Sequence, residues 1–457
     1  MNDSQPFFRL VVKFKDYSNL LNSEEISQSL LQSDLLSFEG LLDIFKDLKF
    51  GKLFSSLESE QIVDLVTRAG KLDPDYKSPD FLAYHTIDCP YEKYSSQILK
   101  ILLDHNKIEK AYIETSSSIP PSNADINYQS FIHQGYLNPA PVGIDAVYCW
   151  SKQGGDGEGQ VKFIDIEQGW NLDSGLFSVK TLPSTGMNFP VFKNHGEAVL
   201  GVILTKDNFG GSKGIAPNAN GYVISQWRPD GSFNTADAIM AAIGQLDYGD
   251  IILLEAQIYD PPDGENLFPV EIQDAVFDVI RLASTLGITV IEAAGNGQRS
   301  FGAGNDLDNY TNSNGKYPLN RSTPDFRDSG AILVAAASDA VPHTKIRHSN
   351  FGSRIDCYAW GERVSTAGSH QGSSEMAIHS YSKKINGTSS AAAIIAGAAI
   401  IVQNIAESCH HFRLGPNHMR QILGNDLLAT ASANGRIIDK IGVMPDMKRI
   451  VDFINLI

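Results

Sequence analysis

The chain has 457 residues, of which 42% are hydrophobic and 20% are charged, and its formal net charge is −16. This composition is typical of a globular protein long enough for two domains, and the negative charge argues against nucleic acid or an anionic membrane as the main partner. The longest uninterrupted apolar run, Ala391 to Val402, is too short to cross a bilayer. The N-terminus lacks the basic and apolar segments of a secretory signal. We therefore expect a cytoplasmic protein without a membrane span, while export by a leaderless route stays open.

The four cysteines are scattered along the chain, and no two of them have the spacing of a metal-binding or redox pair. They are Cys89, Cys149, Cys357 and Cys409. We expect free thiols rather than a disulfide framework or a zinc site.

Residues 1–114 are predicted to form a small α+β domain, because strand-like and helix-like segments are mixed over this length. A helix is expected within residues 55–70, where Ser55 and Glu58 have capping-box spacing and Gly70 suits the position after a helix end. Residues 7–14 and 81–87 are predicted to be strands, and residues 94–106 are predicted to be a helix.

The stretch from Thr115 to Asp125, TSSSIPPSNAD, is rich in serine and proline and is typical of an exposed linker. We place a linker at residues 115–127 and a second domain at residues 128–457.

In this second domain apolar runs alternate with helical patterns. Continuous apolar strands separated by helices indicate a parallel sheet that is covered on both faces, and functional residues then gather at the carboxyl ends of the strands. The predicted strands are VKFIDI, GYVISQ, IILLEAQ, TVIEAAGN, AILVAAAS and DCYAWG.

Four polar residues lie at strand ends or helix starts, where functional sites form in such sheets. Asp165 ends one apolar strand, Asn296 ends another, His195 precedes a helix, and Ser389 opens the apolar run after Gly-Thr. Each of these residues alone is more simply a cap or a turn residue. Together they supply the hydroxyl, the imidazole, the carboxylate and the oxyanion donor that nucleophilic catalysis needs.

The order Asp, His, Ser and the surrounding motifs resemble the subtilisin-like serine peptidases, the subtilases. The resemblance rests on VKFIDI, NHGEAVLGVI, GIAPNA, EAAGN, SNFGSRIDCYAWG, NGTSSAAAIIAG and GVMPDM, which cover roughly residues 128–450. It implies a three-layer α/β/α domain with a parallel sheet. It also implies a serine endopeptidase that hydrolyses protein or peptide substrates through an acyl-enzyme. The implied triad is Asp165, His195 and Ser389, with Asn296 in the oxyanion hole and no cofactor required for catalysis.

The sequence also departs from the subtilase pattern. Proline is missing after the nucleophile, where Ser390 and three alanines follow. The family's aspartate is followed by Thr or Ser and then Gly, whereas Ile166-Glu167-Gln168-Gly169 follow Asp165. The substrate-cleft strand, usually Ser-Leu-Gly, has become Glu255-Ala256-Gln257.

These departures make substrate specificity an open question. The residues expected to line the cleft are Glu255, Ala256, Gln257 and Gly295. The Glu255 carboxylate either favours a basic substrate side chain or points away from the cleft. The loop KDNFGGSKG resembles a calcium-binding segment of subtilases, with Asp173 and Asn208 as candidate ligands for a structural calcium, and a solvated turn explains the same residues equally well.

The N-terminal domain is similar to a subtilase propeptide, which implies an intramolecular chaperone and inhibitor, and hence a zymogen that cleaves itself between Glu114 and Tyr128. Two alternatives stay open. A serine-carboxyl peptidase of the sedolisin type carries glutamate for the histidine and aspartate for the asparagine, so His195 and Asn296 favour the subtilisin chemistry. A catalytically silent binding or scaffold protein of the same fold would need no intact site.

Overall fold

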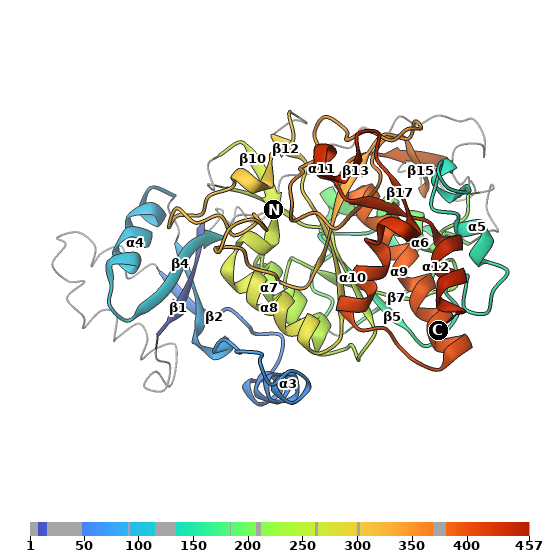
Figure 1. The fold of residues 1–457 in the computed structure, drawn as a ribbon. Helices are drawn as coiled ribbons and strands as arrows, with labels where there is room; N and C mark the ends of the chain where they lie inside the picture. Colours follow the sequence, from blue (N-terminus) through green and yellow to red (C-terminus); the bar gives the residue numbers. More distant parts are fainter. Residues whose placement is uncertain are drawn as a thin grey trace. The chain divides into compact units, whose positions relative to one another are not determined.

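The computed structural model divides the chain into two compact units, residues 1–116 and 117–457 (Figure 1). The residues that the structure describes are 8–15, 48–89, 92–114, 134–182, 184–206, 212–260, 264–298, 302–368 and 381–456. The predicted linker, residues 115–127, lies outside them.

The first unit is an antiparallel sheet with helices, as the sequence predicts. Its strand order is β2-β3-β1-β4, and α4 packs on β1 and β4 through Ile98 and Leu102. The elements are β1 (Phe8–Phe14), β2 (Lys49–Lys52), α3 (Ser59–Leu72), β3 (Tyr84–Cys89), α4 (Glu92–Asp104) and β4 (Ile108–Glu114).

The start and end predicted for α3 were wrong. Glu58 caps the helix and forms a capping box with Gln61, so the box lies three residues after the predicted one. Gly70 lies inside the helix, which continues to Leu72, and an added Cβ there would meet nothing within 4 Å. An exposed glycine is therefore tolerated at a modest cost in helix stability.

The second unit is built on a nine-stranded sheet in the order β17-β18-β14-β13-β11-β8-β5-β7-β6. All neighbouring strands are parallel except the edge pair β17 and β18, which the sequence patterns did not reveal. The strands are β5 (Lys162–Glu167), β6 (Val179–Thr181), β7 (Asn220–Ser225), β8 (Ile251–Leu254), β11 (Thr289–Ala293), β13 (Ile332–Ala337), β14 (Cys357–Trp360), β17 (Ala429–Ala431) and β18 (Val443–Pro445).

Two small antiparallel sheets lie outside this main sheet. One contains β9 (Gln257–Tyr259), β10 (Asn266–Pro269) and β12 (Gly297–Gln298), and the other contains β15 (Val364–Gly368) and β16 (Tyr381–Ile385).

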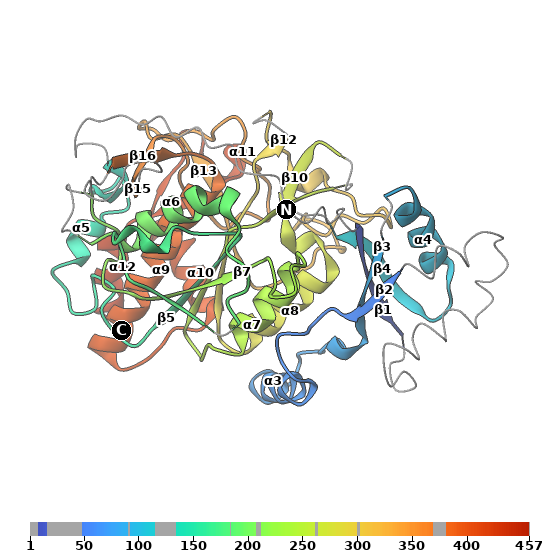
Figure 2. The same cartoon turned by 180° about the vertical axis from the view of Figure 1, so that it is seen from behind.

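Helices cover the main sheet and complete the predicted three-layer fold (Figures 1 and 2). In one layer α9 crosses β8, β11, β13 and β14 and packs on α6, while α7 and α8 pack together against β7, β5 and β11. The helices are α5 (Ala146–Cys149), α6 (Lys193–Leu204), α7 (Thr235–Ile243), α8 (Asp274–Thr285), α9 (Thr388–His410), α10 (Pro416–Leu423), α11 (Gly435–Asp439) and α12 (Met447–Ile454).

Helix α9 is the central core helix of this unit. By length and hydropathy alone it is long and apolar enough to cross a membrane, but 94% of its most apolar window is buried inside the protein. Its apolar residues are therefore accounted for by packing against the sheet and α6.

The four cysteines, all within the described residues, are free thiols, as predicted from their spacing. Cys89, Cys149 and Cys357 are buried, whereas Cys409 is exposed.

Candidate active site

The candidate site is built on the carboxyl edge of two neighbouring parallel strands, β5 and β8. Ile166 pairs with Leu254, so the next residues, Glu167 and Glu255, stand side by side at this edge. The Glu255 N–H donates to the Ile166 carbonyl at 3.0 Å and fixes this register beyond the end of β8. Both side chains are buried, at 1% and 5% exposure.

Glu167 is the carboxylate that holds His195. Its Oε2 is paired with His195 Nδ1, and its Oε1 accepts a hydrogen bond from the Gln168 N–H at 2.8 Å. His195 is the third residue of α6, and an added Cβ on the adjacent Gly196 would lie 3.0 Å from Glu167 Cγ and 2.3 Å from the Gly169 carbonyl. A glycine at position 196 is therefore what allows α6 to approach the carboxylate. Burial lowers the pKa of His195, but the charge and hydrogen bond of Glu167 outweigh it and raise that pKa overall.

The prediction that Asp165 pairs with His195 was wrong in its geometry. Asp165 is fully buried, and its Oδ2 accepts a hydrogen bond from Trp170 Nε1 at 2.7 Å. The physical reason is that β5 continues beyond Asp165 to Glu167, so Glu167 rather than Asp165 reaches the edge on the same face. Burial and the nearby Glu167 charge hold the pKa of Asp165 well above its usual range, against the effect of Trp170.

Ser389 and Asn296 come together at the start of α9, as expected. Ser389 is the second residue of the helix and is half-buried. Asn296 Oδ1 accepts from the Thr388 N–H at 2.9 Å and from Thr388 Oγ1 at 3.2 Å, which turns the Asn296 amide group toward the helix start. Gly387, at φ 97°, makes this turn, and an added Cβ would lie 2.7 Å from Asn296 Oδ1.

One of the predicted cleft residues, Gln257, contacts a site residue directly. Gln257 Oε1 accepts from the Asn296 N–H at 3.0 Å and from Asn296 Nδ2 at 3.2 Å, so Gln257 fixes the other side of the amide. Gly295 is buried at φ 89°, where an added Cβ would lie 2.8 Å from Asn350 Nδ2. Ala256 is buried between Glu255 and the start of β9.

The Glu255 carboxyl group points into the catalytic cluster, which neither of the sequence-based alternatives foresaw. One of its oxygens, a Glu167 oxygen and a His195 ring nitrogen all lie within 4.8 Å of one another. Burial, then the charges of Glu167 and Asp165, hold the pKa of Glu255 well above its usual range, and a hydrogen bond from Ser389 acts in the opposite direction. Among the described residues no hydrogen bond joins Ser389 to His195, and the Ser389 hydroxyl instead faces Glu255.

In this structure Glu167 Oε2 and His195 Nδ1 are hydrogen-bonded to each other, so these two atoms are not free to bind a metal ion. Of the calcium candidates, Asp173 is exposed in the turn after β5, and Asn208 lies outside the described residues. The calcium hypothesis therefore stays a prediction.

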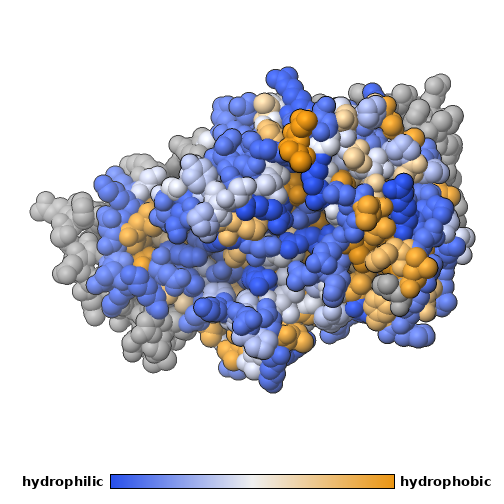
Figure 3. Space-filling view, in the orientation of Figure 1, coloured by the Kyte–Doolittle hydropathy of each residue, from blue (hydrophilic) through white to orange (hydrophobic). Residues whose placement is uncertain are grey.

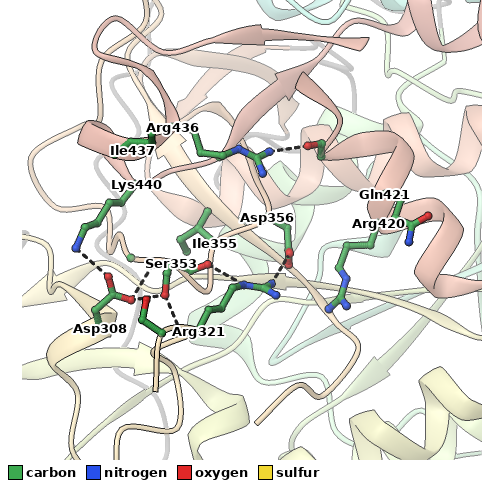
Figure 4. Close-up of a pocket in the computed structure, with 14 residues that line it drawn as sticks. Asp308, Arg321, Ser353, Ile355, Asp356, Arg420, Gln421, Arg436, Ile437 and Lys440 are labelled. Atoms are coloured by element: carbon green, nitrogen blue, oxygen red, sulfur yellow. Dashed lines mark hydrogen bonds and ion pairs between the residues drawn. The ribbon is translucent and has the colours of Figure 1, made fainter. Parts of the chain in front are cut away.

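A separate pocket of about 660 Å³ contains none of these residues (Figure 4). Its charged groups are paired with protein groups: Arg321 with Asp356 at 2.9 Å, Lys440 with Asp308 at 2.8 Å and Arg420 with Asp328 at 2.7 Å. Ile437 of α11 borders this pocket and is 89% exposed, and apolar atoms at α11 stand out on the otherwise largely hydrophilic face seen in Figure 3. These ion pairs within the protein account for the charged residues that line the pocket.

The sequence held one signal for Glu167. In subtilases the catalytic aspartate precedes a Thr or Ser and then a Gly, and Glu167-Gln168-Gly169 has this spacing, whereas Asp165 does not. The structure explains the glycine, because an added Cβ on Gly169 would lie 2.4 Å from the Phe189 carbonyl. The match was missed because the residue with this spacing is a glutamate and not an aspartate, and because it lies two residues after Asp165.

No curated protein matches the chain. The protease domain of PatA has a TM-score of 0.46 and 16% identity, covering 65% of this chain and 95% of that chain. The prenylagaramide maturation protease PagA has a TM-score of 0.46 and 17% identity, covering 68% and 98%. A cold-adapted subtilisin-like serine proteinase has a TM-score of 0.43 and 18% identity, covering 63% and 88%.

The subtilase family itself matches residues 181–437, which is more than half of the chain. This match includes His195, Glu255, Asn296 and Ser389 and begins after β5, the strand whose end departs from the family pattern. Nothing in the fold or the comparisons favours the silent scaffold alternative. The chain belongs to the subtilase family and is a serine-type peptidase by membership.

Proposed function

We propose that this protein is a serine endopeptidase whose catalytic triad is Ser389, His195 and Glu167. The observation that carries this proposal is the pairing of Glu167 with His195 Nδ1 at the same sheet edge at which α9 presents Ser389. Glutamate in place of aspartate does the same work, because a buried carboxylate fixes the tautomer of the imidazole and stabilises the imidazolium.

The reaction follows from these positions. Ser389 Oγ attacks the scissile carbonyl of a peptide substrate while its proton passes to the base, and the acyl-enzyme forms as the proton moves on to the leaving amine. The Ser389 N–H and Asn296 Nδ2 are the donors for the oxyanion, which the positive end of the 23-residue α9 also favours. Water then releases the acyl group by the same steps, and this chemistry needs no cofactor.

No hydrogen bond joins Ser389 to His195 among the described residues, and we expect the two side chains to come within hydrogen-bond distance when substrate binds. Such loose contacts are common in enzymes without substrate.

We further propose that the N-terminal unit is a propeptide that inhibits and assists the folding of the peptidase unit. Its antiparallel sheet with α3 and α4 is a self-contained α+β domain that ends, after β4, next to the linker. Parallel sheets of high contact order form slowly, which gives an attached folding aid a physical purpose.

The experiment is labelling with a fluorophosphonate, which reacts with an activated serine. The wild-type protein should be labelled, and Ser389→Ala should lose both the label and peptide hydrolysis. Ser390→Ala is the matched control, because Ser390 Oγ donates to the Gly387 carbonyl at 2.8 Å and has no role in the reaction. Equal labelling of the wild type and Ser389→Ala would refute the assignment.

A further inference from the structure

The Glu255 carboxyl group is placed as a functional group rather than as a structural one. It follows β8 at the carboxyl edge and is 5% exposed. Apart from Ser389, neither of its carboxyl oxygens has a hydrogen-bond partner among the described residues, and none of the described lysines or arginines forms an ion pair with it. A buried carboxyl group with so few partners costs folding energy, and such a group points to a functional rather than a stabilising role.

The titratable groups closest to Glu255 are mostly acidic. Glu167 and Asp165 face it from β5, His195 faces it from α6, and Ser389 faces it from α9. On the side of β7 and α7, the only buried charges in the described residues are Arg228 and Asp237, which form an ion pair at 2.9 Å. His195 is therefore the one basic group near Glu255 within the described part of the chain.

From this geometry we propose, building on the proposed peptidase function, that Glu255 is a further catalytic residue that shares one proton with His195. With Glu167 ionised, the pair holds its proton either on Glu255 or on His195, and the two forms carry the same total charge. In either form the other member of the pair is unprotonated and can accept a proton. Groups this close titrate as a pair and not singly.

The proton balance of the reaction is simple. When the Ser389 Oγ–carbon bond forms, the Ser389 proton passes to the basic member, and the pair holds two protons while the carbonyl electrons move onto the oxyanion. When the carbon–nitrogen bond breaks, one proton passes to the leaving amine and the pair returns to one proton. Water repeats both transfers during deacylation. Full deprotonation of the pair leaves an uncompensated carboxylate beside the oxyanion and slows the reaction.

The test is the pH dependence of kcat/KM for wild type and Glu255→Gln. The wild type should give a bell-shaped profile, because activity needs one proton on the pair. Glu255→Gln should lose the alkaline limb, and its single acidic limb should lie between the two wild-type limbs, about one pH unit above the wild-type acidic limb. The matched control is Glu292→Gln, because Glu292 is also fully buried with a raised pKa but lies next to Glu271 and Arg354. Its profile should stay bell-shaped.

A second variant, Glu255→Asp, keeps the test valid if Glu255→Gln fails to fold. It keeps a carboxyl group and should keep both limbs even if its rate falls. A profile of Glu255→Gln that matches the wild type in both limbs would overturn the inference, and so would loss of the alkaline limb in Glu255→Asp. Fluorophosphonate labelling of the wild type separates the two proposals, since an unlabelled wild type refutes the peptidase function itself.

Discussion

Two carboxyl groups on the same face of β5 have different roles because their partners differ. Asp165 is fully buried with only the Trp170 N–H as a partner, and its raised pKa favours the neutral form. Glu167, two residues further along, pairs with His195 Nδ1 and accepts a hydrogen bond from the Gln168 N–H. Two positions on the same face of one strand therefore give one structural carboxyl group and one partner for the imidazole.

Gly387 is the residue that most directly links the backbone to the oxyanion hole. Gly387→Ala would force a side chain into a positive-φ position and push its Cβ toward Asn296 Oδ1, at 2.7 Å in the present geometry. We expect kcat to fall about 100-fold with little change in KM, because one oxyanion donor is displaced.

The matched control for this prediction is Gly315→Ala. Gly315 has φ 70° with nothing within 4 Å of an added Cβ, so an alanine there also takes a positive φ but meets no neighbouring atom. The stability of Gly315→Ala should fall less than that of Gly387→Ala, and its steady-state kinetics should match the wild type. Equal losses of kcat in both variants would show that strain alone, and not Asn296, is responsible.

At the scale of elements, the sequence predicted the main features and missed the details set by neighbouring strands. Apolar runs separated by amphipathic patterns revealed β5, β7, β8, β11, β13 and β14 and the four helices around them, because burial on both faces requires continuous apolar sequence. The antiparallel edge strand β17 and the small sheets have only two to five residues per strand, too few for a visible period.

The residues of the candidate site were predicted and missed for the same reasons. His195, Asn296 and Ser389 were predicted because each stands beside a short motif that repeats across the family, and the structure brings Asn296 to the start of α9. The partner of His195 was missed because β5 continues to Glu167, two residues beyond Asp165, the polar residue expected at the strand end. The position of Glu255 depends on the register between β5 and β8, which involves residues far apart in the sequence.

At the scale of the whole molecule, the proposed zymogen makes a prediction about the two units. Wild-type protein should lose an N-terminal piece that ends between Glu114 and Tyr128, whereas Ser389→Ala should keep it, because cleavage by the protein's own site needs the nucleophile. Measuring the intact mass of both proteins over time tests whether the N-terminal piece is lost. A wild type that is labelled by fluorophosphonate and hydrolyses peptides while its N-terminus stays intact would contradict self-cleavage.

The central claim is that Glu167, and not Asp165, orients His195 in a serine peptidase. The most direct measurement is kcat for peptide hydrolysis by Glu167→Gln beside Asp165→Asn, with folding checked by circular dichroism. We expect Glu167→Gln to lose about 10⁴-fold, since an amide stabilises the wrong tautomer of the imidazole. Asp165→Asn should stay within about tenfold, because its amide oxygen can still accept from Trp170 and a neutral hydrogen bond is worth about 1 kcal/mol. The reverse order of losses, with Asp165→Asn the slower variant, would contradict the account.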